Sequence, residues 1–272
     1  MLFRSDINTN NQNNVYLPDI LLPKNIKFTS TLDNLVKEAD LIVMAVASNF
    51  YRNVLRKIKP FVKSSHIILS TAKALEENTM KRMSQVVVEE LSGIIKKDNV
   101  AVLSGPNLAF EIARGLPAAT VIASVSNKTS EMVQKAYINE KLRVYTNTDV
   151  IGTELGGTIK NIIALAAGTI DGLDYGNNTK AALLVRGLKE MTRLGCSLGA
   201  KAETFFGLSG MGDLICTCNS NLSRNWKVGY EVAKGNRLED VLSKMVAVAE
   251  GVNTSRVANE LAKKIKVELP IT

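Results

Sequence analysis

The stretch Asp40-Leu-Ile-Val-Met-Ala-Val46 decides the fold of this chain. A continuous apolar run of this length is typical of a strand that is buried on both faces, as the strands of parallel sheets are. Helical patterns precede it at 33–39 and follow it at 50–62. The stretch therefore predicts a β-strand set between two helices, which is the building unit of an α/β sheet.

The same alternation of strands and helices continues to about residue 148. It indicates an α/β fold with a Rossmann-like, parallel and doubly wound sheet. Residues 1–30 show no such pattern, since 8–14 is a polar loop and Tyr16-Leu-Pro-Asp19 is typical of a turn. We predict further strands at 66–70, 100–103, 118–123 and 143–146, and further helices at 78–95 and 130–138.

Beyond Thr148 the pattern changes to helices that are separated by glycines. We therefore place a domain boundary near Val150 and expect the second domain to be nearly all helix. The helices are predicted at 154–167, 180–198, 224–234, 238–246 and 252–264.

The composition narrows the classes of protein and of partner. The chain has 272 residues and is 46% hydrophobic, so it can bury a core. Its net charge of +8 favours anionic partners. The alternative is that the lysines are simply solvated on the outer faces of helices. Aromatic residues make up 5% and interleave with no basic run, which argues against nucleic acid as a partner. With 3 cysteines and 1 histidine we expect no metal site and a reducing, cytoplasmic compartment.

Targeting and membrane segments are not predicted either. The opening Met1-Leu-Phe-Arg-Ser-Asp6 turns polar at once, unlike a signal peptide. The longest apolar stretches, 41–47 and 162–168, are much shorter than the roughly 20 residues of a membrane span.

Lys160 is the first candidate for catalysis. On a helix its neighbours three and four residues away are Gly156, Gly157, Ile163 and Ala164, most of them very small. A glycine costs about 1 kcal/mol in a helix interior, so two in a row indicate a close approach by a ligand or by another backbone. A lysine over such a groove loses solvent, which lowers its pKa and prepares it for proton transfer. The alternative is a surface lysine whose stem covers apolar neighbours.

The cluster Ser223-Arg224-Asn225 is the second candidate, because it stands at the start of a predicted helix. Ser223 fits an N-cap, and a helix start offers free backbone N–H groups to a phosphate. Arg224 adds two parallel donors for phosphate oxygens. The alternative is an ordinary cap followed by a solvated arginine.

Three further segments carry polar side chains at ends of predicted elements. Gly207-Leu-Ser-Gly-Met-Gly-Asp213 is expected to be a tight loop that aims the Asp213 carboxylate at a lysine or a substrate hydroxyl, unless it only caps a helix. Lys73 and Gly105 follow strands, where ligands of open parallel sheets bind. His66 lies at the beginning of its strand, at the opposite edge, and is therefore not expected to be catalytic.

Six blocks of the sequence together resemble bacterial NAD(P)-dependent glycerol-3-phosphate dehydrogenase. They occur in the order and spacing of that family from about residue 7 to the end, and the set is far more specific than any single block. The blocks are Leu103-Ser-Gly-Pro-Asn-Leu-Ala109, Val144-Tyr-Thr-Asn-Thr-Asp-Val-Ile-Gly152, Glu154-Leu-Gly-Gly-Thr-Ile-Lys-Asn161, Gly210-Met-Gly-Asp213, Ser223-Arg-Asn225 and Ala249-Glu-Gly251.

The resemblance implies an oxidoreductase that interconverts dihydroxyacetone phosphate and sn-glycerol 3-phosphate, which is used for phospholipid synthesis. A hydride would pass between the substrate and NAD or NADP. Residues 1–149 would be a dinucleotide-binding domain, and residues 150–272 a helical domain that binds substrate and carries the catalytic groups. Many relatives are dimers, so the resemblance is compatible with a homodimer, although the sequence shows no self-complementary face.

The resemblance implies roles for single residues as well. Lys160 would be the general acid on the carbonyl oxygen, Lys73 would support the substrate, and Asp213 and Asn161 would orient the substrate and Lys160. Arg224 and Asn225 would hold the phosphate. The implied substrate site is Lys73, Gly105, Asn107, Lys160, Asn161, Asp213, Ser223, Arg224 and Asn225, and the implied cofactor site is Lys73, Ala109, Arg224, Val248 and Glu250.

The chain also departs from the pattern of that family. Ala72-Lys73-Ala74 stands where the family has Thr-Lys-Gly, and Asn107 stands where it has serine. The largest departure is the glycine turn that cradles a pyrophosphate, because Gly93 is the one glycine before Gly105. We therefore expect the first βαβ unit and the last helices of the family to be missing. Such a chain would expose an apolar sheet edge, be unstable and bind cofactor weakly.

Two other interpretations stay open. The chain could be a non-catalytic remnant of that enzyme, which only folds or binds a partner through its helical part. It could also be a different two-domain dehydrogenase that acts on a hydroxy acid or a sugar acid, although the Ser223-Arg224-Asn225 cluster favours a phosphorylated substrate.

Overall fold

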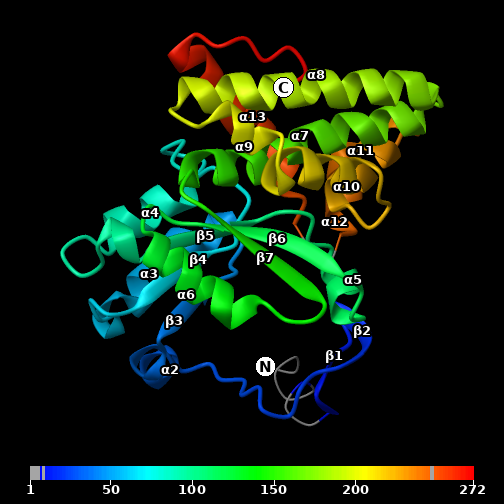
Figure 1. The fold of residues 1–272 in the computed structure, drawn as a ribbon. Helices are drawn as coiled ribbons and strands as arrows, with labels where there is room; N and C mark the ends of the chain where they lie inside the picture. Colours follow the sequence, from blue (N-terminus) through cyan, green and yellow to red (C-terminus); the bar gives the residue numbers. More distant parts are fainter. Residues whose placement is uncertain (1–6, 8–9, 246–247) are drawn as a thin grey trace.

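The structure is a computed structural model, and it describes residue 7, residues 10–245 and residues 248–272. Figure 1 shows a sheet-based part with a layer of long helices above it. The chain passes through the sheet first and enters the helical part at α7 (Val150–Gly172). The predicted order, an α/β part followed by an all-α part, is confirmed, since none of the described residues from 150 onward lies in a strand.

Five strands form the main sheet, in the order β3-β4-β5-β6-β7. Three neighbouring pairs are parallel, as predicted, but β5 and β6 are antiparallel. The prediction of a wholly parallel sheet is therefore wrong at this pair, because residues 105–117 turn back at the end of β5 and do not cross a face of the sheet. The strands are β3 (Leu41–Met44), β4 (Ile67–Ser70), β5 (Val100–Ser104), β6 (Ala118–Ala123) and β7 (Leu142–Asn147).

The apolar run at 40–46 does form a strand, β3, but it is not buried on both faces. Only Met44 is buried in this strand, and Val43 is 42% exposed. The reason is position, because β3 lies at the edge of the sheet and pairs with β4 alone. The strand that is buried throughout is β4.

Helices cover both faces of the sheet, and alternate residues of β4 pack against them. Ile68 belongs to one core with Leu55 and Val86, whereas Leu69 belongs to another with Val133. This alternation is the period of two residues that a strand imposes on its side chains. The helices of this part are α2 (Leu32–Glu38), α3 (Ser48–Ile58), α4 (Met83–Glu90), α5 (Ala109–Ala113) and α6 (Asn127–Tyr137), with short 3₁₀ turns η1 (Lys59–Phe61) and η2 (Lys97–Asn99).

Two segments differ from their predicted structure. Of the turn predicted at 16–19, Tyr16 lies in the turn that connects β1 (Gln12–Asn13) to β2 (Leu17–Leu21), whereas residues 17–19 belong to β2 itself. The two strands form a separate irregular hairpin that tolerates Pro18. Residues 8 and 9 of the predicted polar loop lie outside the described residues. The helix predicted at 78–95 is only α4, because residues 71–82 form an extended loop that is closed by an antiparallel bridge between Leu75 and Arg82.

The central element of the helical part is α7, which packs against α8, α10, α11 and α13. The Asp149 side chain caps its first turn by accepting a hydrogen bond from Gly152 N at 2.9 Å. Within the part of the chain that the structure describes, α7 alone is long and apolar enough to cross a membrane, and 78% of its most apolar window is buried inside the protein. These are the properties of a core helix.

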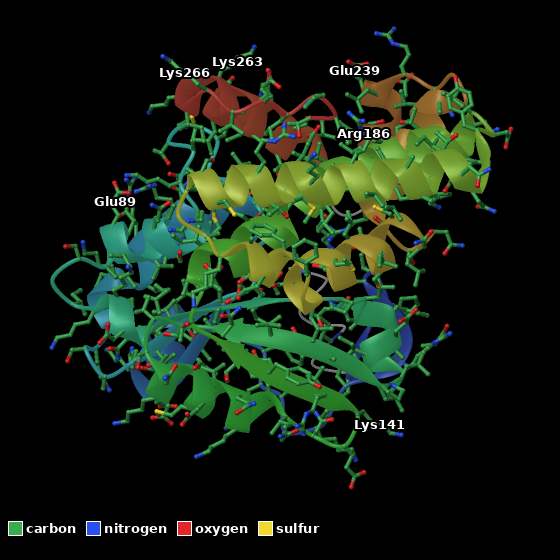
Figure 2. All side chains as sticks on the ribbon, turned by 45° about the horizontal axis from the view of Figure 1, so that its top comes forward. Glu89, Lys141, Arg186, Glu239, Lys263 and Lys266 are labelled. Atoms are coloured by element: carbon green, nitrogen blue, oxygen red, sulfur yellow. The ribbon has the colours of Figure 1, made fainter. Side chains whose placement is uncertain are left out.

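The other helices of this part surround α7. Polar and charged side chains cover their outer surface, among them Arg186 on α8 and Lys263 on α13 (Figure 2). The predicted helix at 238–246 ends at Ser243, and residue 246 is not among the described residues. The elements are α8 (Gly176–Ser197), α9 (Ala202–Phe205), the π-helical turn η3 (Leu208–Gly212), α10 (Asp213–Cys218), α11 (Arg224–Ala233), α12 (Leu238–Ser243) and α13 (Glu250–Ile265).

Candidate functional site

The paired glycines of α7 lie where the helix passes between the sheet and the segment that leads to α10. A Cβ at Gly156 would collide with the carbonyl oxygen of Ser209, and a Cβ at Gly157 would collide with Oγ of Ser104 at the end of β5. The two glycines therefore make room for protein atoms of neighbouring segments and not for a ligand. It brings the next turn of α7, with Lys160, to the carboxyl ends of the strands.

Lys160 is buried, and its amine lies in a pocket of polar atoms from α10. Lys160 Nζ lies 2.5 Å from Asp213 Oδ1 and 2.5 Å from Thr217 Oγ1. The Asp213 and Thr217 side chains also contact each other, at 3.2 Å. The Lys160 side chain is 7% exposed and that of Asp213 is 2% exposed, so this ion pair is largely withdrawn from water.

Lys73 reaches the same carboxylate from the sheet-based part. Its Nζ donates to Asp213 Oδ2 at 2.7 Å and to the carbonyl oxygen of Gly105 at 2.9 Å. One carboxylate therefore holds two ammonium groups, one on each of its oxygens. The Lys73 side chain, 19% exposed, is the more open of the two lysines.

The environment of Lys160 lowers its pKa to about 8. Burial is the largest cause, because a charged amine loses its hydration, and the positive charge of Lys73 acts in the same direction. The Asp213 carboxylate opposes both but does not cancel them. An amine with this pKa can give up or take back a proton near neutral pH.

Further polar groups stand at the ends of the strands. The amide of Asn161 donates to the carbonyl oxygens of Lys73 and Gly157, at 3.3 and 3.4 Å. The amide nitrogen of Asn107 donates to Thr120 at 2.9 Å, and its buried oxygen has no partner among the described residues. Ser104 Oγ is also buried without a partner in that part of the chain. Such unpaired buried atoms are suited to a ligand that enters from above the strands.

The start of α11 is built as the sequence predicted. Ser223 is the N-cap, and its Oγ accepts from Trp226 N at 3.3 Å. Arg224 is exposed and uses one guanidinium nitrogen on the carbonyl oxygen of Val248, at 2.8 Å. Asn225 is buried and accepts a hydrogen bond from Gly251 N at 2.9 Å. All three side chains thus also hold the local structure together.

Glu250 connects the start of α11 with the two lysines. Burial raises the pKa of its carboxyl group, whereas the charges of Arg224, Lys73 and Lys160 act against that rise. The backbone of Ser48, at the start of α3, also acts to lower this pKa. Glu250 therefore lies within electrostatic reach of the buried ion pair and of the sheet.

The structure joins five of the predicted residues directly, and it adds one. Lys73, Gly105, Lys160, Asn161 and Asp213 are joined by hydrogen bonds. Arg224 and Val248 form a separate pair at the surface, and Ala109 is the first residue of α5. Thr217 was missed, although its place four residues after Asp213 on a helix is the signal that would have found it.

Asp213 itself does not stand in a loop. The residues before it form the π-helical turn η3, which runs directly into α10, so Asp213 is the first residue of that helix. The prediction of a loop is wrong because Gly210 packs directly against the backbone of Phe205 and the chain winds tightly there. The predicted effect, a fixed carboxylate, still results.

A polar cleft opens beside α10, on the side that faces α5. Its volume is about 470 Å³. Cys216, which lies between Asp213 and Thr217 in the sequence, is one of its lining residues. The others are Leu108, Glu111, Asp171, Asn219, Ser220, Asn221, Leu222 and Trp226.

A metal ion has no candidate ligands here. Among the described residues, no group of three or more His, Cys, Asp or Glu side chains could hold one. The arrangement instead offers a proton donor of moderate pKa, a second cation, and unpaired polar atoms at the carboxyl ends of parallel strands. Those strand ends are where α/β sheets bind dinucleotides, so the residues fit such a cofactor.

Comparison with known proteins identifies the family of this arrangement. The model of the NAD-dependent glycerol-3-phosphate dehydrogenase N-terminus matches residues 3–130, and the model of its C-terminus matches residues 149–272. A glycerol-3-phosphate dehydrogenase [NAD(P)+] of Dehalococcoides mccartyi is 49% identical over 261 residues, which cover 94% of this chain and 72% of that protein. One of Listeria innocua is 45% identical, with 98% of this chain and 79% of that protein covered.

A solved structure points to the same family. The crystal structure of glycerol-3-phosphate dehydrogenase from Coxiella burnetii superposes with a TM-score of 0.93 at 34% identity, covering 99% of this chain and 81% of that chain. The matches extend over the sheet-based part and the helical part alike. The chain therefore belongs to the NAD-dependent glycerol-3-phosphate dehydrogenase family.

Proposed function

We propose that this chain interconverts dihydroxyacetone phosphate and sn-glycerol 3-phosphate with NAD or NADP. The observation that carries the proposal is the buried Lys160 amine, whose pKa is lowered to about 8 between Lys73 and Asp213. The relatives that bear the name of this activity support it, since they are up to 49% identical. Their similarity covers both parts of the chain, which speaks against a remnant without catalytic function.

Lys160 is proposed as the proton donor. Below its pKa of about 8 the amine is protonated and gives its proton to the carbonyl oxygen of the ketone. In the reverse direction the neutral amine takes the proton from the alcohol. When bound, the nicotinamide supplies or receives the hydride at the carbon atom. Thr217, in contact with the amine, would help to fix the direction of its remaining protons.

Lys73 and Asp213 are proposed to set the charge around that proton transfer. The Lys73 ammonium, fixed by Asp213 and by the Gly105 carbonyl, would stabilise the negative charge that develops on the substrate oxygen. The Asp213 carboxylate would hold both lysines at the substrate. Asn161 bonds the main chain of Lys73 and would keep that residue in place.

The phosphate is proposed to bind at the start of α11. Arg224 is exposed there and has guanidinium nitrogens beyond the one that bonds Val248. The N-terminus of a helix favours an anion, and Ser223 and Asn225 would shape this end of the site. Dihydroxyacetone without the phosphate should then bind much more weakly.

The cofactor is proposed to lie along the carboxyl ends of the strands, against Lys73, Ala109, Arg224, Val248 and Glu250. The unpaired buried oxygen of Asn107 would serve the substrate or the cofactor there. We also propose that residues 1–149 act as the cofactor domain and residues 150–272 as the catalytic domain. The free cysteines fit the cytoplasm, and assembly as a homodimer is a separate proposal for sedimentation to test.

A direct assay tests the proposal. Purified protein should oxidise NADH or NADPH with dihydroxyacetone phosphate, and the same concentration of dihydroxyacetone should give a rate lower by orders of magnitude. Arg224→Met should raise KM for the phosphorylated ketone much more than KM for the unphosphorylated one. Equal turnover of both ketones would contradict the proposed phosphate site, and no turnover of either would contradict the proposed reaction.

A further inference from the structure

The loop from 71 to 82, which we call the carrier loop, connects β4 to α4 and carries Lys73. It is a closed structure, because Leu75 and Arg82 form a β-bridge and Glu76 N donates to the Lys81 carbonyl at 2.9 Å. Lys73 at its start and Arg82 at its end are therefore mechanically connected. Whatever holds the ends of the carrier loop also determines where the Lys73 amine lies.

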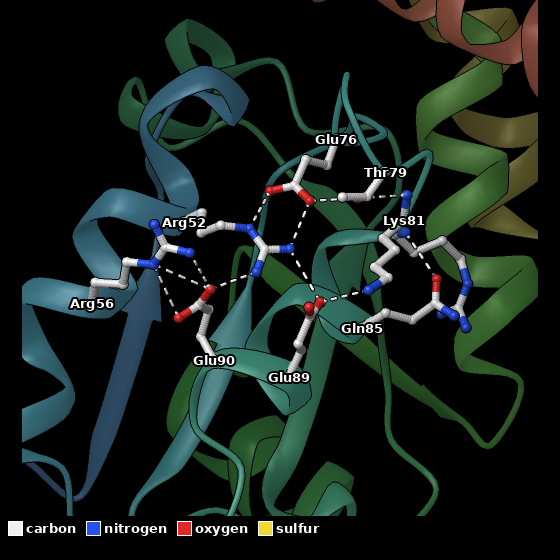
Figure 3. A network of polar contacts seen from close by, with 9 residues as sticks. Arg52, Arg56, Glu76, Thr79, Lys81, Gln85, Glu89 and Glu90 are labelled. Carbon is white, nitrogen blue, oxygen red and sulfur yellow. Dashed lines mark hydrogen bonds and ion pairs between the residues drawn. The ribbon is translucent and has the colours of Figure 1, made fainter.

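One attachment of the carrier loop is made to the sheet-based part (Figure 3). Arg52 of α3 binds the Glu76 carboxylate with two parallel hydrogen bonds of 2.7 Å, from Nε and Nη2. Arg52 also binds Glu90 of α4 at 2.5 Å. This paired geometry fixes the direction of the carboxylate as well as its distance.

A second attachment is made to the helical part, through Glu154 of α7. Its Oε2 accepts from Arg82 Nη1 and from Ser84 Oγ, both at 2.5 Å, and its Oε1 accepts from Ser84 N at 2.9 Å. The Glu154 side chain is 5% exposed. Both oxygens of a buried carboxylate on α7 are thus bound by the end of the carrier loop and the start of α4.

The two attachments have a geometric consequence for the amines. Glu154 and Lys160 stand on the same helix, and Lys73 lies two residues before Leu75, which is bridged to Arg82. Fixing Glu154 to Arg82 therefore sets the distance at which Lys73 and Lys160 meet on Asp213. Breaking a buried ion pair leaves an uncompensated charge, so the loop would move to solvate it.

We propose that Glu154 and Arg82 form a positioning clamp that sets α7 against the carrier loop and so holds Lys73 and Lys160 on opposite oxygens of Asp213. Neither clamp residue contacts the lysine amines in the structure, so both act through the carrier loop and α7. The inference rests on the proposed function for its effect on catalysis. Its effect on the pKa of the Lys160 amine does not depend on that function.

The first test is kinetic and uses Glu154→Gln, which keeps the shape of the side chain and removes its charge. We expect kcat for dihydroxyacetone phosphate to fall by about 10- to 100-fold with little change in KM, because a displacement of about 1 Å at a catalytic group costs that much. In a Lys73→Met background, where the clamp no longer has Lys73 to position, Glu154→Gln should cost less than about threefold. Equal losses in both backgrounds would overturn the clamp.

The second test needs no turnover, so it separates the clamp from the proposed function. In the whole chain, the Lys160 amine is titrated by NMR with labelled lysine, before and after Glu154→Gln. In the wild type the pKa of this amine is set by burial, Lys73, Asp213 and Cys216, its charge also acts on Glu250 and Cys218, and it bonds Thr217. Withdrawal of Lys73 and entry of water should raise its pKa by at least half a unit, and Arg82→Met should do the same. An unchanged titration in both folded variants would overturn the inference even if the enzyme is active.

Arg56→Met is the matched control. Arg56 belongs to the same charged network, but its side chain is 60% exposed and it bonds only Glu90 among the described residues. We expect its kcat and its Lys160 titration to equal those of the wild type. Should Glu154→Gln fail to fold, Glu154→Asp, which shortens the clamp and keeps its charge, must show the same direction of change in the Lys160 titration, and a wild-type titration would overturn the inference.

Discussion

Two clusters of charged side chains lie near the carrier loop. Both consist of basic side chains and carboxylates, but they differ in net charge and in burial. In the network of Figure 3, Arg52, Arg56 and Lys81 face Glu76, Glu89 and Glu90, so cations and carboxylates balance. In the candidate active site, Lys73 and Lys160 share the single carboxylate of Asp213. One cluster is neutral and partly solvated, whereas the other carries an excess of positive charge in a buried place.

The protonation behaviour follows from this difference. In the network the pKa of Glu76 is lowered, chiefly by Arg52, and those of Glu89 and Glu90 are lowered chiefly by Lys81 and Arg56. All three carboxylates therefore stay charged through the physiological range. In the active site the pKa of Lys160 falls to about 8, into the range where its proton can be exchanged. Reactivity here comes from burial and unmatched charge, and the residue types alone do not produce it.

The largest expected effect comes from removing the unmatched amine. Lys160→Met should lower kcat for dihydroxyacetone phosphate by about 10²- to 10⁴-fold, the usual contribution of a general acid. The folded state should survive, because the methionine fills the same space and Asp213 keeps its bond to Lys73. Steady-state kinetics together with circular dichroism check this prediction, and a variant that keeps a tenth of the activity would remove Lys160 from the mechanism.

The next largest effect is an opposite change with pH in the rates of ketone reduction and alcohol oxidation. Reduction needs the protonated Lys160 and should decline as pH rises through about 8, whereas oxidation needs the neutral amine and should increase over the same range. Rates in both directions between about pH 6 and 10 test this. If the two rates changed with pH in the same direction, or changed only near the ordinary pKa of a lysine, the excess positive charge would not be lowering the pKa of the catalytic group.

The two clusters should also affect stability at opposite ends of the pH scale. The lowered carboxyl pKa values of the network mean that its contribution is present above the ordinary value of 4.5 and is lost as pH falls through the folded values. The lowered Lys160 pKa gives a slope of the same sign in a different window, since the unfolded chain binds the extra proton between about 8 and 10.5, so stability should rise with pH there as well.

Urea unfolding at several pH values gives the free energy of unfolding as a function of pH. Its slope in acid reports on the network, and its slope in alkali reports on Lys160. Arg52→Met should remove part of the acid slope and leave the alkaline slope in place, and Lys160→Met should do the reverse. The network is partly solvated, so its contribution is expected to be small, on the order of 1 kcal/mol. If one variant changed both slopes equally, the two clusters would be a single coupled system.

The smallest effect is expected at the solvated edge of the network. Lys81 bonds Glu89 at 2.7 Å, but both side chains are about two-fifths exposed, at 39% and 44%. Lys81→Met should therefore leave the midpoint of urea unfolding close to that of the wild type. A clearly lower midpoint would mean that even the exposed rim of the network holds the carrier loop, and it would weaken the contrast with the buried site.

Local patterns in the sequence predicted the parts of the fold that depend on neighbouring residues. The strand–helix alternation, the long helix around Lys160 and the Ser223 cap are of this kind. Burial of β3 was predicted wrongly because an edge position depends on which strands pair. The antiparallel β5–β6 pair was missed for the same reason.

The candidate site divides in the same way. The glycines beside Lys160 and the position of Lys73 after a strand are local patterns, and they are enough to indicate both residues. A contact of Asp213 with a lysine was expected, but that Lys73 shares this carboxylate with Lys160 could not be read from the sequence, because Lys73 and Asp213 are 140 residues apart. Glu154 gave no signal at all, since its partners Arg82 and Ser84 lie in a segment that was predicted as one continuous helix. Contacts between distant segments decide the chemistry here.

A titration of the Lys160 amine in the wild-type chain tests the central claim most directly. With lysine labelled at the side chain and Lys160→Met to assign the signal, NMR should show this amine losing its proton near pH 8 while the exposed lysines titrate near their ordinary value of about 10.4. A Lys160 signal that titrates together with the exposed lysines would contradict the claim that burial and an unmatched second cation prepare this residue for proton transfer.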